Sequence, residues 1–247
     1  MAVPHFLTIC TIQDLRPSIF KDPQDGWHGF EADLLTGFAH TLGLEPQFRI
    51  VPFEKIWLRP LAGECDIAAA GITILPERIS QGTRFSRPVF RLDQSLLIRA
   101  ADSRQVRSIS DLSGAVIGVL PGTTGETSAR RRASRDTSFH TFDSEEEMIA
   151  ALRAGTIDAI ARGTLGNTHQ ADAHPDLAVT GIEPTDEWIG FATAPDNPAL
   201  RLQLDFYLRT IRATGRLAAL HKEWFPAMPV PPALLPLLKK SIRISPG

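Results

Sequence analysis

The first third of the chain alternates between short apolar runs and one longer stretch with helical spacing. Phe6–Ile12 is apolar and β-branched, which is typical of a buried strand. Apolar residues recur every three or four positions within Phe30–Leu44, which predicts an amphipathic helix, and Gly43 suits its C-terminal end. Pro46–Phe53 alternates like a strand, and Cys65–Ile74 has the pattern of a buried strand that runs into a loop. With a short helix between these two, the β-α-β-α-β order predicts a parallel sheet covered by helices.

The middle of the chain repeats this order of elements. Ser95–Ala100 and Thr156–Ala161 have strand patterns, and a turn is predicted after the second. Ala115–Glu126 reads as a strand that enters a Gly/Thr turn. Ser144–Gly155 is predicted to be a helix, because its first residue and the glutamate three positions later form a capping-box pattern. Residues 13–29 are rich in Pro, Asp and Gly and predict a loop.

The last quarter of the chain contains one more strand and a long helical region. Trp188–Ala194 is predicted to be a strand, residues 197–225 one or two amphipathic helices, and the Pro-rich residues 227–247 a surface tail. The strands near 95–100 and 188–194 would link the two βαβ series, and two linking strands indicate a hinge. The pattern therefore predicts an α/β protein of two lobes, with a ligand crevice at the carboxyl ends of the strands.

Composition and charge exclude several classes of function. The 247 residues include 43% hydrophobic ones, enough for a sizeable core, and the formal net charge is -2 at pH 7. This charge gives no electrostatic case for binding nucleic acid or an anionic membrane surface. No apolar run approaches the roughly 18 residues of a membrane-spanning helix. The N-terminus lacks the pattern of a secretory signal, so we expect either a cytoplasmic protein or one whose signal has been removed.

The chain has two cysteines, Cys10 and Cys65, and neither has a neighbour at metal-ligand or redox-motif spacing. Cys10 lies within an apolar strand pattern, where a cysteine usually serves as a small buried hydrophobe. A disulfide would require adjacent strands and an oxidising compartment, so two buried thiols are the favoured prediction. No zinc spacing, Walker loop, dinucleotide fingerprint or nucleophile elbow is present, and neither a metal nor a cofactor is expected.

Five segments occur in an order that identifies a family. They are GFEADLLTGFAHTLGL, GECDIAAAGITILPERISQGTRFSRPVF, DLSGAVIGVLPGTTGE, MIAALRAGTIDAI and TGRLAALHKEWFP. Together they resemble the polar amino-acid family (family 3) of periplasmic solute-binding proteins, the receptors of ABC importers.

The resemblance implies the fold of a type II periplasmic binding protein, with two Rossmann-like lobes joined by two hinge strands. It implies a first lobe of residues 2–97 plus 190–226, a second lobe of 102–187 and a C-terminal tail of 227–247. It also implies a periplasmic monomer that binds a small carboxylate-containing ligand and docks on a membrane permease.

The resemblance also implies a set of carboxylate-binding residues. In the segment GITILPER, Arg78 matches the arginine that grips the ligand carboxylate, with Thr73 and the Gly71 backbone beside it. A guanidinium suits this role because it offers a fixed fork of donors. From the other lobe, the GTT turn contributes Thr123 and Thr124, whose helix-opening N–H groups favour an anion. The alternatives are a surface salt bridge for Arg78 and an ordinary helix N-cap for the turn.

Three residues of the first lobe match the walls of the ligand side-chain pocket. Leu15 stands where the family usually has a stacking aromatic residue, with Asp14 beside it, and Phe53 matches a second aromatic wall. Plain core packing is the alternative for Phe53. The resemblance thus implies a pocket that is aliphatic on one side and acidic near Asp14.

One position departs from the family pattern. The strand in GTIDAIARGT should end in an aspartate that pairs with the ligand's ammonium, but this position falls on Gly163. Three interpretations stay open: a ligand without an α-amine, another acid in its place (Asp14, Glu187 or Asp186), or a shifted register. Thr164 offers a neutral hydrogen bond just beyond. Arg162 is expected to face away from the cleft and to pair with an acid of a helix, because side chains alternate along a strand.

An enzyme is the alternative to a receptor. Cyclohexadienyl dehydratases resemble these receptors and use the same cleft for an acid-catalysed elimination on prephenate or arogenate. Such a reaction requires a positioned general acid, for which Glu187, Asp14 and Glu126 are the candidates. None of them lies in a motif that matches the dehydratases, so a binding protein without catalytic residues is the favoured prediction.

Overall fold

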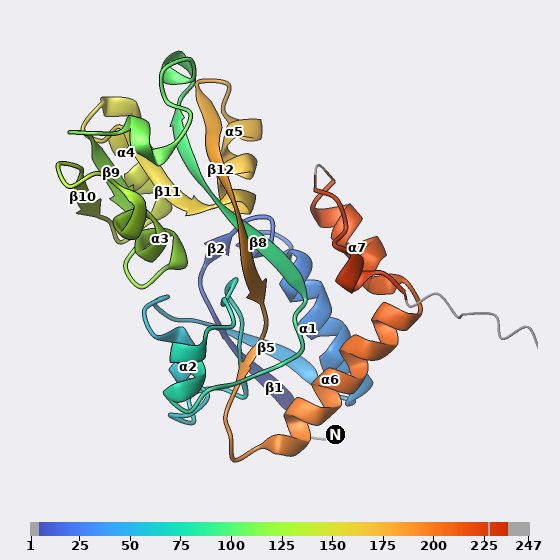
Figure 1. The fold of residues 1–247 in the computed structure, drawn as a ribbon. Helices are drawn as coiled ribbons and strands as arrows, with labels where there is room; N and C mark the ends of the chain where they lie inside the picture. Colours follow the sequence, from blue (N-terminus) through green and yellow to red (C-terminus); the bar gives the residue numbers. More distant parts are fainter. Residues whose placement is uncertain (1–4, 227, 237–247) are drawn as a thin grey trace, which may run out of the picture.

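The computed structural model describes residues 5–226 and 228–236. The chain forms two lobes, each built around a five-stranded sheet. Two long strands, β8 (Phe90–Arg99) and β12 (Leu177–Ile189), run from one lobe into the other and pair with each other in antiparallel fashion (Figure 1). The prediction of a two-lobed α/β fold is therefore confirmed.

The first lobe contains the sheet β5-β1-β6-β13-β7. Its strands are β1 (Phe6–Thr11), β5 (Glu45–Ile50), β6 (Ile67–Ala68), β7 (Arg84–Phe85) and β13 (Ala192–Thr193). The helices of this lobe are α1 (Phe30–Thr41), α2 (Pro76–Ser80), α6 (Pro198–Ala213) and α7 (Arg216–Trp224). Leu7 and Ile9 of β1 share one core with α1, α6 and α7, whereas Cys10 shares a second core with Trp57, because alternate side chains of a strand point to opposite faces.

The second lobe contains the sheet β10-β9-β11-β8-β12. Its remaining strands are β9 (Val116–Val119), β10 (Ser138–Thr141) and β11 (Ala159–Gly163). Its helices are α3 (Thr124–Arg132), α4 (Glu145–Ala154) and α5 (Thr164–Ala173). In both lobes the first three strands in this order are parallel. The fourth strand, β13 or β8, runs antiparallel to them, and the fifth, β7 or β12, pairs in antiparallel fashion with the fourth, so the expected parallel sheets are mixed sheets. The reason is that β8, β12 and β13 belong to the segments by which the chain passes between the lobes.

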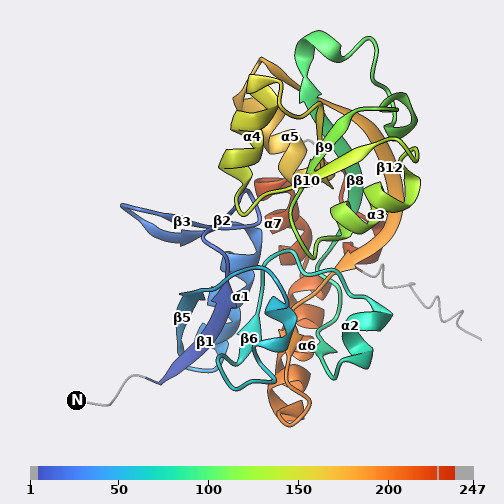
Figure 2. The same cartoon turned by 90° about the vertical axis from the view of Figure 1, so that its left-hand side faces the viewer.

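Two predictions of irregular structure are wrong. Residues 13–29 include a small antiparallel sheet of β2 (Asp14–Leu15), β3 (Ile19–Asp22) and β4 (Gly26–His28), which projects from the body of the molecule (Figure 2). These strands are too short and too rich in turn residues to show a strand pattern. The predicted turn after β11 is the start of α5, a helix of weak amphipathic character. Single helical turns complete the structure at Ile56–Leu58, Ala100–Asp102, Ile109–Asp111 and Pro232–Leu234.

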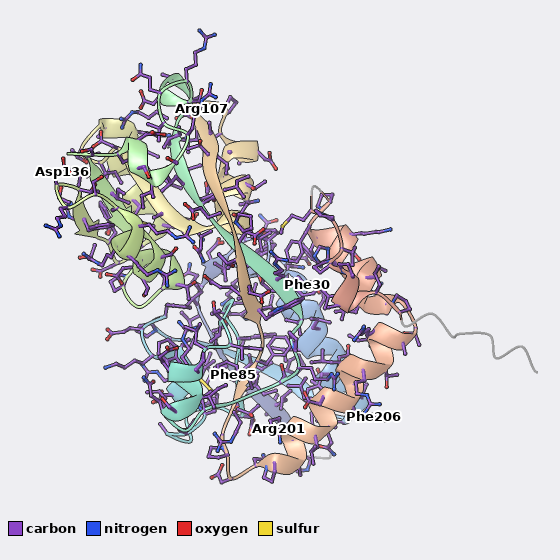
Figure 3. The ribbon with its side chains drawn as sticks, in the orientation of Figure 1. Phe30, Phe85, Arg107, Asp136, Arg201 and Phe206 are labelled. Carbon is purple, nitrogen blue, oxygen red and sulfur yellow. A yellow bond between two sulfur atoms is a disulfide. The ribbon has the colours of Figure 1, made fainter. Side chains whose placement is uncertain are left out.

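The described part of the C-terminal tail packs on the first lobe. Leu234 is buried in the core that α1, α6 and α7 share, and Arg212 of α6 donates to the carbonyl oxygen of Leu235 at 3.0 Å. Figure 3 shows the contrast on the same lobe between Phe30, which is buried, and Phe206, whose ring points away from α6 into solvent. The expected lobe boundaries stay a prediction, and residues 2–4, 227 and 237–247 of those ranges lie outside the described residues.

The prediction of two free thiols is wrong, because Cys10 and Cys65 form a disulfide. Parallel pairing of β1 with β6 places Cys10 opposite Ala68, and Cys65 lies just before β6. The sequence could not show that these two strands are neighbours. The disulfide lies in the second core of the first lobe, beside Trp57.

We expect reduction of this disulfide to destabilise the protein. In the chain-entropy account, a cross-link across a separation of 55 residues stabilises the folded state by about 4 kcal/mol. Urea unfolding followed with and without dithiothreitol should show a lower midpoint in the reduced protein. The double variant Cys10→Ala/Cys65→Ala is the control, and its midpoint should not respond to dithiothreitol. Equal midpoints for the oxidised and reduced wild type would contradict the expectation.

Candidate functional site

Arg78 is a buried cation at the edge of the first lobe. It lies in α2, whose first residue is Pro76, and its side chain is held from several directions. Its guanidinium donates to the Thr73 carbonyl at 2.9 Å and to the Gly122 carbonyl at 3.3 Å, and its Cζ lies 4.1 Å from the centre of the Trp57 ring. Because Arg78 is only 4% exposed, the alternative of a surface salt bridge does not apply.

The charge of Arg78 is not neutralised by a bonded acid. Burial lowers the pKa of the guanidinium to about 10, while the nearby carboxylates of Glu187 and Glu77 act in the opposite direction. Arg78 therefore stays protonated at neutral pH. Among the described residues no carboxylate lies within ion-pair distance of it, and its hydrogen bonds go to two carbonyl oxygens. A guanidinium has five N–H donors, so some remain for a ligand.

Glu187 and Thr73 lie next to this cation. Thr73 is buried, forms a bridge to Ile189 of β12, and places its hydroxyl 3.4 Å from Oε2 of Glu187. The Glu187 carboxylate is half-buried and also accepts a hydrogen bond of 3.0 Å from Nε2 of Gln94 on β8. Sequence reasoning missed Gln94, which lies in the strand β8 and in no motif that we recognised.

The second lobe contributes the turn that opens α3. Thr124 is the first residue of α3, and its hydroxyl accepts a hydrogen bond of 3.0 Å from Nε2 of Gln94. Thr123 is the N-cap: its hydroxyl accepts from the Glu126 N–H at 3.1 Å and donates to the Leu120 carbonyl at 2.8 Å. The hydroxyl of Thr123 is thus used within the turn, whereas the hydroxyl hydrogen of Thr124 has no acceptor among the described residues. Gln94 links this turn to Glu187.

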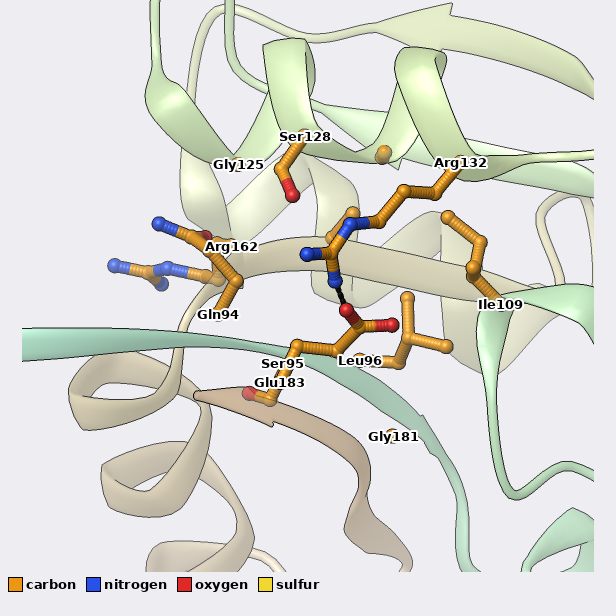
Figure 4. Close-up of a pocket in the computed structure, with 12 residues that line it drawn as sticks. Gln94, Ser95, Leu96, Ile109, Gly125, Ser128, Arg132, Arg162, Gly181 and Glu183 are labelled. Atoms are coloured by element: carbon orange, nitrogen blue, oxygen red, sulfur yellow. Dashed lines mark ion pairs between the residues drawn. The ribbon is translucent and has the colours of Figure 1, made fainter. Parts of the chain in front are cut away.

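Contacts at both ends hold α3 on the second sheet. A side chain at Gly125 would stand 2.7 Å from the Cα of Arg162, so only glycine permits this close approach of α3 to β11. At the other end of α3, Arg132 forms an ion pair with Glu183 of β12 across a small cavity (Figure 4). These contacts fix the position of Thr124 beside Gln94.

The remaining predicted residues of the first lobe have different surroundings. Gly71 has a left-handed backbone (φ 62°), and its N–H donates to Glu31 at 2.8 Å, so this N–H is already used. Leu15 packs directly on Gly71, and Phe53 packs on the core around Trp57. Asp14 is exposed on β2 and forms an ion pair with Arg16.

The end of β11 carries no acid, because its last residue is Gly163. A side chain at Gly163 would meet the side chain of Leu92 at 2.7 Å, so Leu92 fills the space beside this glycine. Arg162 forms an ion pair with Glu145 at the start of α4, which confirms that it pairs with a helix acid. Thr164 is the first residue of α5, and its hydroxyl oxygen is buried without a hydrogen-bond partner in the described structure. The roles of all these residues in ligand binding stay a prediction.

Glu31 is a buried acid that sequence reasoning missed. It is fully buried in α1, and its Oε2 accepts from the Ser18 hydroxyl and the Gly71 N–H, both at 2.8 Å. Burial raises its pKa to about 7, and these two hydrogen bonds only partly offset that effect. Its second oxygen has no partner among the described residues. Glu31 thereby fixes the loop that leads from β6 to Thr73.

Residues 5–226 and 228–236 contain neither a metal-binding cluster nor a membrane-spanning helix. They contain no cluster of three or more His, Cys, Asp or Glu side chains that could hold a metal ion. None of their helices is both long enough and apolar enough to cross a membrane.

The sequence matches the bacterial extracellular solute-binding proteins, family 3, over residues 7–227. The chain belongs to this family. This solute-binding protein is 28% identical over 216 residues to the ABC transporter glutamine-binding protein GlnH of Bacillus subtilis, a match that covers 85% of this chain and 78% of that protein. It is also 28% identical to the membrane-bound lytic murein transglycosylase F of Alcanivorax borkumensis, over 85% of this chain but 46% of that protein.

Solved structures agree with this assignment. An ancestral arginine-binding protein bound to arginine matches with a TM-score of 0.83 and 26% identity, over 89% of this solute-binding protein and 98% of that chain. The ancestral amino acid-binding protein AncCDT-1, a precursor of cyclohexadienyl dehydratase, matches with a TM-score of 0.82 and 26% identity, over 89% of this chain and 95% of that one.

We expect Glu31 to make the stability of the protein depend on pH. In the unfolded chain this carboxyl loses its proton near pH 4.5, but in the folded protein only near 7. The stability that it contributes is therefore present below pH 4.5 and is lost as the pH rises to about 7. Glu31→Gln should be stabilised relative to the wild type by an amount that grows over this window, on the order of 3 kcal/mol.

Urea unfolding of both proteins at pH 4.5, 6 and 7.5 measures this difference. Glu146→Gln, which removes an exposed acid of α4, is the control and should track the wild type. A constant difference between Glu31→Gln and the wild type at the three pH values would show that Glu31 does not titrate as described.

Proposed function

We propose that this solute-binding protein is the ligand receptor of an ABC importer and closes on a small carboxylate-containing solute between its lobes. The solute is an amino acid, an amino-acid derivative or another organic acid. The observation that carries the proposal is the buried guanidinium of Arg78, which faces the other lobe and is bonded to no acid. A ligand carboxylate supplies the partner that this cation lacks.

Several groups beside Arg78 suit the same carboxylate. Thr124 presents a hydroxyl from the other lobe and opens a helix of nine residues. The N–H groups of such a helix end favour an anion. Since these donors come from both lobes, a ligand bound between them stabilises the closed arrangement, as expected of a hinge protein.

The location and partners follow from the family and from the disulfide. Family members are extracellular solute-binding proteins, and a structural disulfide persists in an oxidising compartment. We therefore assign the protein to the periplasm, as a monomer that delivers its ligand to a membrane permease. The proposal requires no cofactor.

The positions of the acids support a receptor over a dehydratase. Asp14 is paired with Arg16, and Glu126 accepts the N–H of Gly122 within the turn before α3 and pairs with Arg130. Glu187 accepts hydrogen bonds from Gln94 and Thr73. Two of the three candidate acids are thus engaged with arginines, and Glu187 serves as a hydrogen-bond acceptor, an arrangement that suits binding better than acid catalysis.

A thermal-shift screen tests the proposed function. The purified protein is heated with each of the standard amino acids, L-cystine, mono- and dicarboxylic acids and prephenate. A ligand at 100 times its Kd stabilises the folded state by about 2.7 kcal/mol, so a true ligand raises the Tm clearly. We expect at least one carboxylate to do so. A screen without any hit contradicts the proposed function, and turnover of prephenate would favour the enzyme.

We expect Arg78→Ala to weaken binding of the ligand found in the screen by at least tenfold. Hydrogen bonds to charged groups contribute about 1.5–3 kcal/mol each, and the substitution removes all those that Arg78 makes to the ligand. Arg78→Lys should recover only part of the affinity, because an ammonium cannot form the same fork. Arg84→Ala, which removes an exposed arginine of the same lobe, is the matched control for titration calorimetry. Unchanged affinity in Arg78→Ala would disprove the assignment of this residue.

A further inference from the structure

We propose that Glu187 on the hinge strand β12 binds the cationic group of the ligand, so that the site selects a zwitterion over a plain carboxylate. This inference rests on the proposed function of the cleft as a carboxylate-binding site. It assigns the amine-binding role to the hinge and not to the end of β11.

The first argument is the placement of the two charges. Arg78 donates to the carbonyl of Thr73, and Glu187 accepts from the hydroxyl of the same residue. The cation and the anion are thus held on the backbone and the side chain of one threonine. A ligand that carries its carboxylate and its ammonium on a single carbon also holds opposite charges close together.

The second argument is that neither charge is neutralised by an ion pair within the described residues. Arg78 and Glu187 do not form an ion pair with each other, and within the described residues no other cation lies within ion-pair distance of Glu187. Both hydrogen bonds to Glu187 go to Oε2, from neutral donors, which leaves Oε1 without a protein donor. A half-buried carboxylate with a free oxygen is a strong acceptor for an ammonium.

The third argument comes from Gln94. Its Nε2 donates to Glu187 and Thr124, but its Oε1 is buried and has no donor among the described residues. A buried acceptor without a donor costs free energy, which a ligand N–H would recover. An ammonium carries three N–H groups, and Glu187 and Gln94 together offer two acceptors for them.

The fourth argument excludes the other acids near the cleft. Gly163 has no side chain, and Leu92 occupies the space that an acid there would need. Leu92 pairs with Glu187 in the register of β8 and β12, so the apolar residue and the acid are neighbours. Asp14 is already paired with Arg16, and Asp186 is exposed and precedes Glu187 on the strand, which directs it to the opposite face.

The test compares Glu187→Gln, which keeps the size and the hydrogen-bonding oxygen but removes the charge, with Asp186→Asn on the same strand. The probes are the standard L-amino acids and L-cystine and, for each that binds, the acid in which hydrogen replaces the α-amine. Titration calorimetry at pH 7.5 gives the ratio of the two Kd values for each protein. We expect the wild type and Asp186→Asn to bind the amino acid at least tenfold more tightly than the desamino acid. For Glu187→Gln we expect a preference of less than threefold. This variant should bind the desamino acid as tightly as the wild type does.

The outcomes separate this inference from the proposed function. If no carboxylate binds the wild type, the proposed function fails. If carboxylates bind but the wild type does not prefer the amine, or if Glu187→Gln keeps the full preference, the function stands and the role of Glu187 is overturned. Glu187→Asp retains the charge on a shorter side chain, and recovery of part of the preference in this variant supports the role even where Glu187→Gln has lost stability.

Discussion

The burial of one positive charge organises the candidate site. Taking a guanidinium out of water is costly unless other groups replace the lost hydration. Arg78 receives that replacement from the Trp57 ring, from the carbonyl of Thr73 and from the carbonyl of Gly122 in the other lobe. Because these groups are neutral, they tolerate the cation without cancelling it. The site is thus built around a charge that still attracts an anion.

The surrounding structure holds these groups in place in both lobes. The disulfide and Trp57 belong to the same core beneath Arg78, and Glu31 fixes the loop that presents Thr73. In the second lobe, close packing at Gly125 and the ion pair of Arg132 hold α3 against its sheet. Gln94, on a strand that crosses between the lobes, is hydrogen-bonded both to the α3 turn and to Glu187. The polar residues of the cleft therefore form a continuous path from one lobe to the other.

The sequence predicts those parts of the structure that depend on local pattern. Helical spacing predicted α1, the capping-box pattern predicted α4, and the motif GITILPER indicated Arg78 and Thr73. The missed features depend on contacts between distant segments. The disulfide requires β1 and β6 to be neighbours. Gln94 has a role only because β8 and β12 pair in the folded protein. Glu31 lies on a helix, and its polar contacts come from two loops. The sheet β2-β3-β4 consists of strands too short to show a period.

The strand order of the first lobe also governs when the site can exist during synthesis. β13, which lies between β6 and β7, is contributed by Ala192 and Thr193, after the strands of the second lobe have already been made. The lobe that begins first on the ribosome is thus completed last. A chain that ends after Glu187 would contain Arg78 and every other residue that we place in the cleft, yet it would lack the strand that joins β6 to β7 beside them. The fully paired sheet of the first lobe therefore forms only after the strands of both lobes have been synthesised.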